Sequence, residues 1–359
     1  MIKGNIGEWS EIYTLLKIIS DKKLSGGNSD IKKVESLVFP IIKVLRDESN
    51  GTFEYSYDND IVVVSGNKEQ FRIPLSKFKE LASQLLKYLK TFPETTSSFP
   101  DIELFLNSFS CYSLKAKSSV KSDIRIVIHD LRTGTTPELG FSIKSQLGKP
   151  ATLFNSSQGS NFIYKIGGNQ LSIEQIERIN TLKSKSKIQD RVKMIIANKS
   201  TLDFQKTEGS IFQNNLTLID SLLPKILSQI IVSFSTSKLN KLKDLVKVIE
   251  KLNPLSFDIS DNHKFYSYKI KRLLSDIALG MVPKTVWTGR LDSTGGYLIV
   301  KEDGEIICYH IYNRNEFENY LLANTKIINP SSTRFKFGKI YEENGELFFK
   351  LNLQIRFIK

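Results

Sequence analysis

The sequence predicts an α+β protein with a mixed central β-sheet flanked by helices, a helical middle region and a β-rich C-terminal lobe. Three observations lead to this class. Hydrophobicity alternates around residues 54–73 and 120–166, helical spacing with many lysines dominates 171–280, and alternation returns after Pro283. The 359 residues are 40% apolar and 25% charged, so wholesale disorder is excluded. The length indicates two or three structural units.

The first segment, residues 1–110, is predicted to combine helices with a β-meander. Helical spacing of apolar side chains, with a loop at 25–30 after the first run, predicts helices over residues 7–20, 31–46 and 76–90. Residues 54–73 alternate around turn residues, which is typical of a small antiparallel meander.

The second segment, residues 111–170, is predicted to be a β core. Two strands over 120–130 and 139–147 flank the turn LRTGTTPE, and 161–166 form a third strand. The third segment, residues 171–282, reads as mostly helical and rich in lysine. Two of its helix faces, 181–197 and 238–251, carry lysines beside apolar stripes, and such lysines commonly form only a solvated surface.

The fourth segment, residues 283–359, is predicted to be β-rich. Asp303-Gly304 and Asn344-Gly345 mark the turns of two hairpins, and a short helix is expected between them at 315–324. The alternation in KLNLQIRF, at the end of the second hairpin, places four apolar side chains on one face. The sequence leaves open whether this segment is a separate lobe or completes a larger structure.

The positive charge is concentrated downstream. The net charge is +13 overall, −1 for residues 1–110 and +14 for 111–359. A positive field attracts polyanions, so nucleic acid is the leading partner, with simple solubility or a membrane surface as alternatives.

Several classes of protein are excluded or disfavoured. No apolar run is long enough to span a membrane and no signal peptide is visible, so a cytoplasmic location is expected. The two cysteines cannot form a disulfide framework, and the three histidines show no zinc-ligand spacing. Neither GxxxxGK[ST] nor GxSxG occurs, which argues against an ATP-driven enzyme and a serine hydrolase.

The central hairpin carries the residues most suited to catalysis. With its turn centred near 134–135, Asp123 is expected opposite residue 146 and near Lys144 and Gln146. Alternation puts Ser142 on the same face as Lys144 and Gln146. Asp130 lies beside the turn, too far along the hairpin to be the partner of Lys144.

This arrangement suits metal-assisted phosphodiester hydrolysis, as in the PD-(D/E)XK nuclease core. The Asp123 carboxylate and the Ile143 carbonyl would be oxygen ligands of Mg²⁺, and Lys144 would orient water and balance phosphate charge. The core requires an acid where Ser142 stands. Glu11, preferred over Glu8 on the first helix, is the candidate for the missing carboxylate, although acids near a helix start are often only caps.

The sequence also resembles the HpaII family of type II restriction endonucleases. The similar stretches are KGNIGEWSEIYTLLKI, SDIRIVIHD, ELGFSIKSQLGKPATLFNSS, VWTGRLDSTGGYLIV, CYHIYNRNEFENYLLANTKI and KLNLQIRF. The resemblance implies a restriction-endonuclease-like fold and Mg²⁺-dependent cleavage of double-stranded DNA at a short palindrome, CCGG in the type enzyme. It also implies that Asp123 and Lys144 are catalytic. A further implication is a cognate DNA methyltransferase, part of a restriction-modification system, which acts on the same site and forms no stable complex with the enzyme.

Two other functions and the oligomeric state stay open at this point. A sequence-specific DNA-binding protein without catalysis would explain Ser142, and a nonspecific nuclease would share the same core. A palindrome is usually read by a two-fold homodimer, but a monomer can also read a short site.

Candidates for reading base edges cluster in polar runs after the catalytic strand and in the C-terminal lobe, which is the expected recognition region. They are Asn155, Ser156, Gln158, Arg290, Asn313, Arg314, Asn315 and Arg334. The alternative for the run at 313–315 is a polar helix start.

Overall fold

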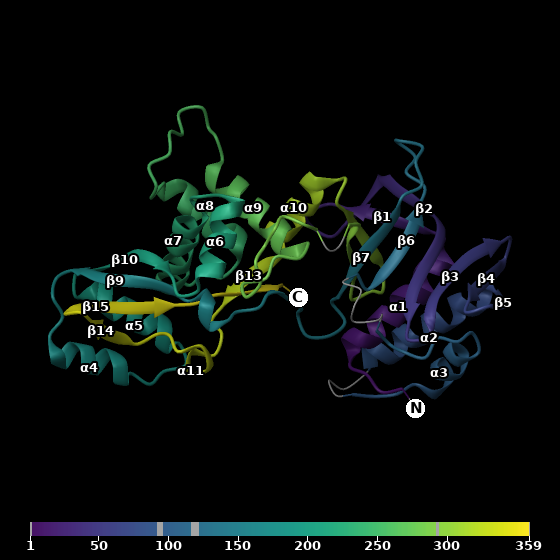
Figure 1. The fold of residues 1–359 in the computed structure, drawn as a ribbon, viewed down its shortest axis with the longest axis horizontal. Helices are drawn as coiled ribbons and strands as arrows, with labels where there is room; N and C mark the ends of the chain where they lie inside the picture. Colours follow the sequence, from purple (N-terminus) through teal and green to yellow (C-terminus); the bar gives the residue numbers. More distant parts are fainter. Residues whose placement is uncertain (1, 92–95, 116–121, 292–293, 359) are drawn as a thin grey trace. The chain divides into compact units, whose positions relative to one another are not determined.

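The structure, a computed structural model, describes residues 2–91, 96–115, 122–291 and 294–358. The chain forms two compact units (Figure 1). Unit 1 comprises Met1–Ala151 and Leu291–Tyr320 with Lys359, and unit 2 comprises Thr152–Arg290 and Leu321–Ile358. Residues 283–359 are thus divided between the units, with one part completing the sheet of unit 1.

Unit 1 contains four helices and nine strands among its described residues. The helices are α1 (Ile6–Asp21), α2 (Leu75–Thr91), α3 (Pro100–Asn107) and α10 (Arg314–Ala323), of which the last three residues, from Leu321, belong to unit 2. The strands are β1 (Lys23–Gly27), β2 (Lys33–Glu48), β3 (Gly51–Asp58), β4 (Ile61–Gly66), β5 (Glu69–Pro74), β6 (Ile124–Ile128), β7 (Glu138–Ser145), β11 (Gly296–Val300) and β12 (Ile306–His310).

Six of these strands close into a barrel-like mixed sheet. The order is β1-β12-β11-β7-β6-β2, and β1 also pairs with β2, which closes the ring. β7 pairs with β11 and β12 pairs with β1 in parallel, whereas β6 and β7 are antiparallel. β2 is 16 residues long, and its C-terminal part continues into the meander β3-β4-β5.

The prediction of a helix over 31–46 is wrong, because this segment forms the long strand β2. Its sequence KVESLVFPIIKVLRDE is rich in β-branched residues. Pro40 lies in the middle, where it would remove a helix hydrogen bond and clash with the preceding turn. The predicted loop at 25–30 also begins within β1. The predicted strand over 120–130 is shorter, since β6 ends at Ile128, and Val120 and Lys121 lie outside the described residues.

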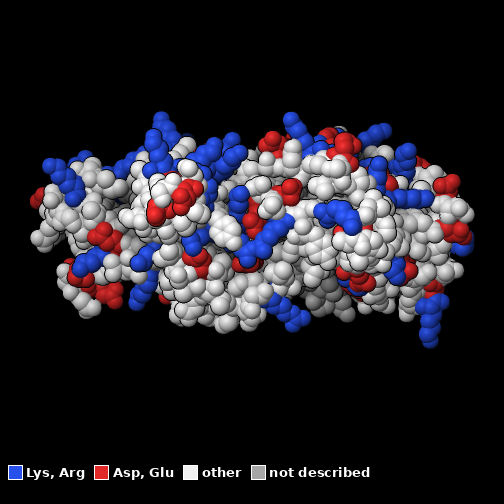
Figure 2. Space-filling model, turned by 90° about the horizontal axis from the view of Figure 1, so that it is seen from above, with Lys and Arg blue, Asp and Glu red and all other residues white. Residues whose placement is uncertain are grey.

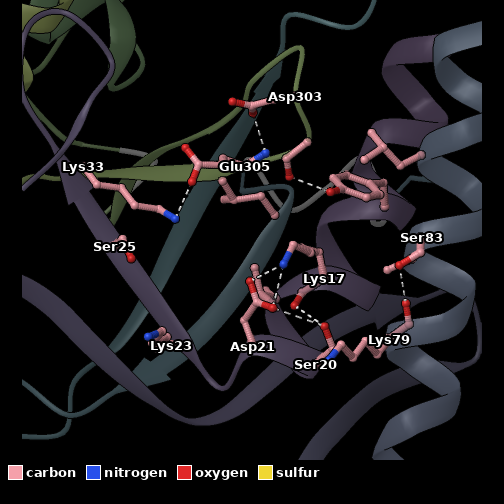
Figure 3. A pocket seen from close by; sticks show the side chains of 16 residues that line it. Lys17, Ser20, Asp21, Lys23, Ser25, Lys33, Lys79, Ser83, Asp303 and Glu305 are labelled. Atoms are coloured by element: carbon pink, nitrogen blue, oxygen red, sulfur yellow. Dashed lines mark hydrogen bonds and ion pairs between the residues drawn. The ribbon is translucent and has the colours of Figure 1, made fainter.

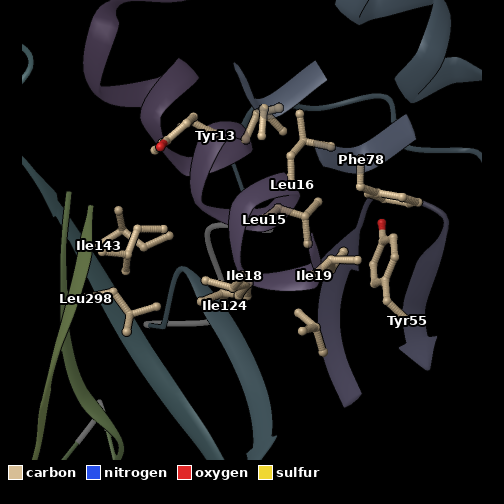
Figure 4. Packing of buried hydrophobic residues seen from close by; sticks show 14 of the residues in the cluster. Tyr13, Leu15, Leu16, Ile18, Ile19, Tyr55, Phe78, Ile124, Ile143 and Leu298 are labelled. Atoms are coloured by element: carbon tan, nitrogen blue, oxygen red, sulfur yellow. The ribbon is translucent and has the colours of Figure 1, made fainter. Parts of the chain in front are cut away.

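Helix α1 forms the centre of the hydrophobic core. It begins at Ile6 because Asn5 and Glu8 form a capping box. Nine of its sixteen residues are buried. Figure 4 shows its apolar side chains against Ile124, Ile143 and Leu298 of β6, β7 and β11. The helix is therefore held firmly against the strands that carry the candidate site.

Unit 2 combines six α-helices, a short α11 and seven strands among its described residues. The helices are α4 (Ile173–Thr181), α5 (Lys187–Ala197), α6 (Ser210–Ile219), α7 (Leu223–Thr236), α8 (Leu242–Leu252), α9 (Phe265–Ala278) and α11 (Ser332–Phe335), with a 3-10 turn at Gln158–Ser160. The strands are β8 (Thr152–Phe154), β9 (Phe162–Gly168), β10 (Ser200–Thr207), β13 (Thr325–Ile328), β14 (Ile340–Glu343), β15 (Glu346–Leu351) and β16 (Gln354–Phe357).

Two small sheets accompany the helices of unit 2. One has the order β10-β9-β15-β14 and the other β13-β16-β8. The run KLNLQIRF is interrupted at Asn352 and Leu353, so its two halves belong to different sheets. Strand β10 lies inside the region predicted as mostly helical.

The predicted α+β class, with a mixed sheet and a helical middle region, is confirmed. The predicted helices over 7–20, 76–90 and 315–324, the meander and both hairpin turns also agree with the structure. Within the described part of the chain, no single helix is long and apolar enough to cross a membrane. Only α6 and α7 taken together pass by length and composition, and they bend by 107° at their junction.

Candidate active site

The β6–β7 hairpin places Asp123 opposite Ser142. The ladder pairs Val127 with Glu138 and Ile124 with Phe141, and continuing it by one step reaches Ser142. The predicted partner, Gln146, is four positions away, because the turn is centred two residues earlier than expected. Gln146 instead continues the ladder on the other side of β7, where its amide donates to the Val300 carbonyl at 2.8 Å.

A chain of hydrogen bonds joins the three central side chains. The Lys144 ammonium donates to Ser142 Oγ at 3.2 Å, and that hydroxyl donates to Asp123 Oδ2 at 3.2 Å. The Ile143 amide donates to the same Asp123 oxygen at 2.6 Å. Ser142, which replaces the acid of the PD-(D/E)XK pattern, therefore links the lysine to the aspartate.

Strand β11 supplies the surface beneath Lys144. Tyr297 pairs in parallel register with Ser142, and the Lys144 ammonium lies 5.0 Å from the centre of the Tyr297 ring. Burial lowers the pKa of Lys144, although the charges of Asp123 and Glu11 oppose this shift. Sequence reasoning missed Tyr297, because nothing local shows that β7 pairs with a strand about 150 residues later.

Glu11 belongs to the same electrostatic site as Asp123. Helix α1 is attached to β7 through a 2.8 Å hydrogen bond between the Ser10 and Ser145 hydroxyls. Burial and then the Asp123 charge raise the pKa of Glu11 to about 8, against the opposing charges of Arg46, Lys115 and Lys144. The predicted direct approach of the two carboxylates, within the reach of one ion, stays a prediction.

Glu8 has a structural role. Its carboxylate accepts from the Asn5 amide at 2.8 Å in the capping box and forms a 2.6 Å ion pair with Lys115. Burial alone would raise the pKa of Glu8, but its bonds to Lys115 and Asn5 lower it overall. The preference for Glu11 over Glu8 as the free carboxylate is consistent with this arrangement.

A cavity of about 710 Å³ opens beside these residues in unit 1. Glu11, Ile143 and Lys144 line it together with three further lysines, which are Lys90, Lys115 and Lys149. Sequence reasoning did not single out these lysines, which come from separate elements. Their positive charge suits an anionic substrate at the mouth of the site.

The donor set fits a hard cation. Among the described residues, Asp123 Oδ1 and the Glu11 carboxylate have no hydrogen-bond or ion-pair partner, and each charge destabilises the other. Amide and carbonyl of one strand residue point toward the same neighbour, so the Ile143 carbonyl lies on the Asp123 side. Two carboxylates and a carbonyl match Mg²⁺, which often takes only one or two carboxylates. No cluster of three or more His, Cys, Asp or Glu side chains occurs in the described part.

Replacing Glu11 is expected to change stability in a pH-dependent way. A raised folded-state pKa means that the protonated carboxyl stabilises the fold below the unfolded value of about 4.5, and this stability is lost as pH rises through about 8. In chelator, Glu11→Gln should therefore raise Tm by roughly 2–5 °C at pH 9 and leave it nearly unchanged at pH 5. Thermal melting at the two pH values measures this difference.

Glu8→Gln is the matched control. Because its pKa is lowered in the folded state, this variant should lose stability at pH 9. An equal change in Tm for Glu11→Gln at both pH values would contradict the assignment of a half-buried Glu11 whose charge is destabilised in the folded protein.

The candidate base-reading residues are spread over both units. Asn155, Ser156, Gln158, Arg290 and Arg334 lie in unit 2, whereas Asn313, Arg314 and Asn315 lie at the start of α10 in unit 1. Several already have protein partners: Gln158 donates to Glu208 at 2.9 Å, Arg132 donates to Asn313 at 2.8 Å, and Arg314 donates to Glu318 at 2.7 Å. Their contact with DNA stays a prediction.

A second cavity of unit 1, about 350 Å³, lies at the C-terminal half of α1 (Figure 3). Its charges largely neutralise one another, as in the 2.6 Å ion pairs Lys17–Asp21 and Lys33–Glu305. No predicted site residue lines it, so the cavity beside Glu11 and Lys144 is the candidate active site.

The β6–β7 hairpin, the acidic residue Glu11 of α1 and a lysine-lined cavity form a candidate site suited to phosphodiester hydrolysis, the reaction of restriction endonucleases. Residues 5–357 match the family described as HpaII restriction endonuclease, and the chain belongs to this family. It is a type II restriction enzyme, a site-specific endodeoxyribonuclease. It is 49% identical to the type II restriction enzyme HpaII of Haemophilus parainfluenzae over 358 residues, which cover 99% of this chain and 98% of that protein. No solved structure gives a significant match.

Proposed function

We propose that this restriction enzyme hydrolyses duplex DNA at the palindrome CCGG, with Mg²⁺ held by Asp123, Glu11 and the Ile143 carbonyl. The observation that carries the catalytic part is the hydrogen-bonded chain from Lys144 through Ser142 to Asp123. The choice of CCGG rests on the 49% identity to the type enzyme over nearly the full length.

The bound cation would polarise the scissile phosphate and supply the positive charge that two carboxylates require. Asp123 is fixed for this role, because its Oδ2 accepts from Ile143 and Ser142 while Oδ1 stays free of protein donors among the described residues. The Lys144 ammonium uses one of its three N–H donors in the hydrogen bond to Ser142. The other two can bind the attacking water and a phosphate oxygen, which holds both at the reacting position.

Digestion of a supercoiled plasmid tests this function. A plasmid with a single CCGG should become linear with Mg²⁺ and stay supercoiled in chelator. Two controls are needed: the same plasmid methylated at CCGG, and a plasmid without this sequence. A smear of products would indicate a nonspecific nuclease, and retardation without cutting would indicate binding alone.

Affinity for duplex DNA should fall steeply with salt. Each phosphate neutralised by the protein contributes roughly −0.9 to the slope of log affinity against log salt. The surplus of 14 positive charges in residues 111–359 should engage several phosphates. Anisotropy titrations between about 50 and 200 mM KCl measure the slope, and affinity that hardly changes over this range would contradict the proposed binding surface.

The proposal includes the cellular setting of the enzyme. We expect it to act in the cytoplasm beside a cognate methyltransferase that protects host CCGG sites without forming a stable complex. A homodimer would match the two-fold symmetry of the palindrome. Base reading is assigned to the polar residues of α10 and of the region after β8, together with Arg290 and Arg334.

A further inference from the structure

The positive charge of the molecule belongs to unit 2. By the residue ranges of the two units, unit 1 holds 24 basic and 24 acidic side chains, whereas unit 2 holds 27 basic and 14 acidic. Figure 2 shows lysine and arginine side chains along the upper edge of unit 2 with few acidic neighbours, whereas unit 1 mixes both signs. The unit without the candidate catalytic residues therefore carries the entire net charge of +13.

One cavity of unit 2 concentrates this charge. It has a volume of about 280 Å³ and is lined by Lys185, the first turn of α5 and residues 329–333. Figure 1 shows where α5 and α11 lie in unit 2. We call this cavity the basic cavity, and its polar lining consists of Lys185, Lys187, Gln189, Asn329, Ser331, Ser332 and Thr333. Lysine ammonium, amide and hydroxyl groups are the donors that proteins use for DNA phosphates.

Buried contacts hold the two walls of the basic cavity together. The Arg191 side chain is 6% exposed, and it donates to the Gly338 carbonyl at 2.6 Å and to the Asn180 and Leu182 carbonyls at 2.7 and 3.0 Å. Gly338 has φ +82° and packs so closely on Ile188 that an added Cβ would lie 2.1 Å from it. The walls are thus fixed to each other without any ligand.

The charges around the basic cavity are largely uncompensated. Residues 183–190 and 329–339 contain six basic side chains and one acidic side chain, Asp190. Asp190 accepts a 2.5 Å hydrogen bond from Ser184, and no ion pair is found for Lys185 or Lys187 within the described ranges. The exposed Arg334 guanidinium lies over the Phe335 ring, 5.3 Å from its centre, beside the same wall.

We propose that the basic cavity binds a backbone phosphate of duplex DNA away from the scissile bond, through Lys185 and Lys187 and the hydroxyls of Ser331, Ser332 and Thr333. The proposal rests on DNA binding by the restriction enzyme and is independent of the metal site. Such a contact positions the duplex without carrying sequence information.

Paired variants test the proposal in the full-length enzyme. Lys185→Gln/Lys187→Gln should weaken binding roughly 3–10-fold, equally for duplexes with and without CCGG, and make the salt slope shallower by about 1–2. Anisotropy without divalent metal measures binding, so the result does not depend on the proposed catalytic residues.

The matched control is Lys247→Gln/Lys251→Gln, which removes the same charge from two exposed lysines of α8. The slope of log affinity against log salt for this variant should stay near that of the parent. Equal effects of the two double variants would overturn the proposal, because net charge alone would then explain them. Selective loss of CCGG binding would also overturn it, because it would indicate base reading, and unchanged Tm values confirm that both variants fold.

Discussion

Lys144→Ala should abolish cleavage while DNA binding without metal stays close to that of the parent. The ammonium lies above the Tyr297 ring and donates to Ser142, whose hydroxyl reaches Asp123. Removing one donor aimed at the reacting phosphate costs roughly 10²–10³ in rate by analogy with oxyanion donors. Single-turnover digestion of a CCGG duplex and a gel shift in chelator measure the two quantities.

Lys79→Ala is the control for Lys144, because it removes an exposed lysine of α2 that lines the second cavity of unit 1. This variant should cut like the parent. A Lys144→Ala enzyme that cuts within about threefold of the parent would remove Lys144 from the mechanism, since the expected loss is far larger.

Asp123→Asn should lose Mg²⁺-dependent cleavage by roughly 10² or more, whereas Asp130→Asn keeps most of it. An amide lacks the charge of a metal ligand, yet its carbonyl oxygen can still accept from the Ile143 amide, so the hairpin is retained. Asp130 is buried, but it lies at the other end of β6, where its Oδ1 accepts from the Arg132 amide at 3.0 Å.

Cleavage rates against Mg²⁺ concentration, with Tm as a folding check, distinguish the two aspartate variants. An inactive Asp130→Asn beside an active Asp123→Asn would show that the catalytic carboxylate has been assigned to the wrong end of the hairpin.

Local sequence patterns predicted most helices and hairpin turns correctly. They failed where the structure is determined by pairing between strands that are far apart in the sequence. Asp303-Gly304 and Asn344-Gly345 specify their hairpins through backbone conformations that few residues adopt. The segment 31–46 has apolar residues at helical spacing, but Pro40 and pairing with three strands make it β2. β1 closes the barrel and β11 inserts beside β7, but neither pairing can be predicted from the sequence of the strand itself.

Predictions about the candidate site succeeded and failed for the same reasons. Alternation correctly placed Ser142 and Lys144 on one face, because this depends only on strand geometry. The predicted register was wrong because the sequence of the loop LRTGTTPE does not show which residues form the centre of the turn. An error of two residues in this centre changes the predicted partner of Asp123 from Ser142 to Gln146. Tyr297, Arg46 and the cavity lysines come from distant segments, and only the folded structure relates them to Glu11.

The order of strands in unit 1 determines when the candidate site can be assembled during synthesis. β7 is complete at Ser145, but its neighbour β11 begins at Gly296, after most of unit 2 has been translated. At roughly 5–20 residues per second, about 8–30 s separate the two strands on the ribosome. Until then the Tyr297 ring beneath Lys144 is missing and the barrel stays open. A nascent chain, or one terminated early within unit 2, therefore lacks the assembled candidate site, and we expect DNA cleavage only by nearly finished molecules.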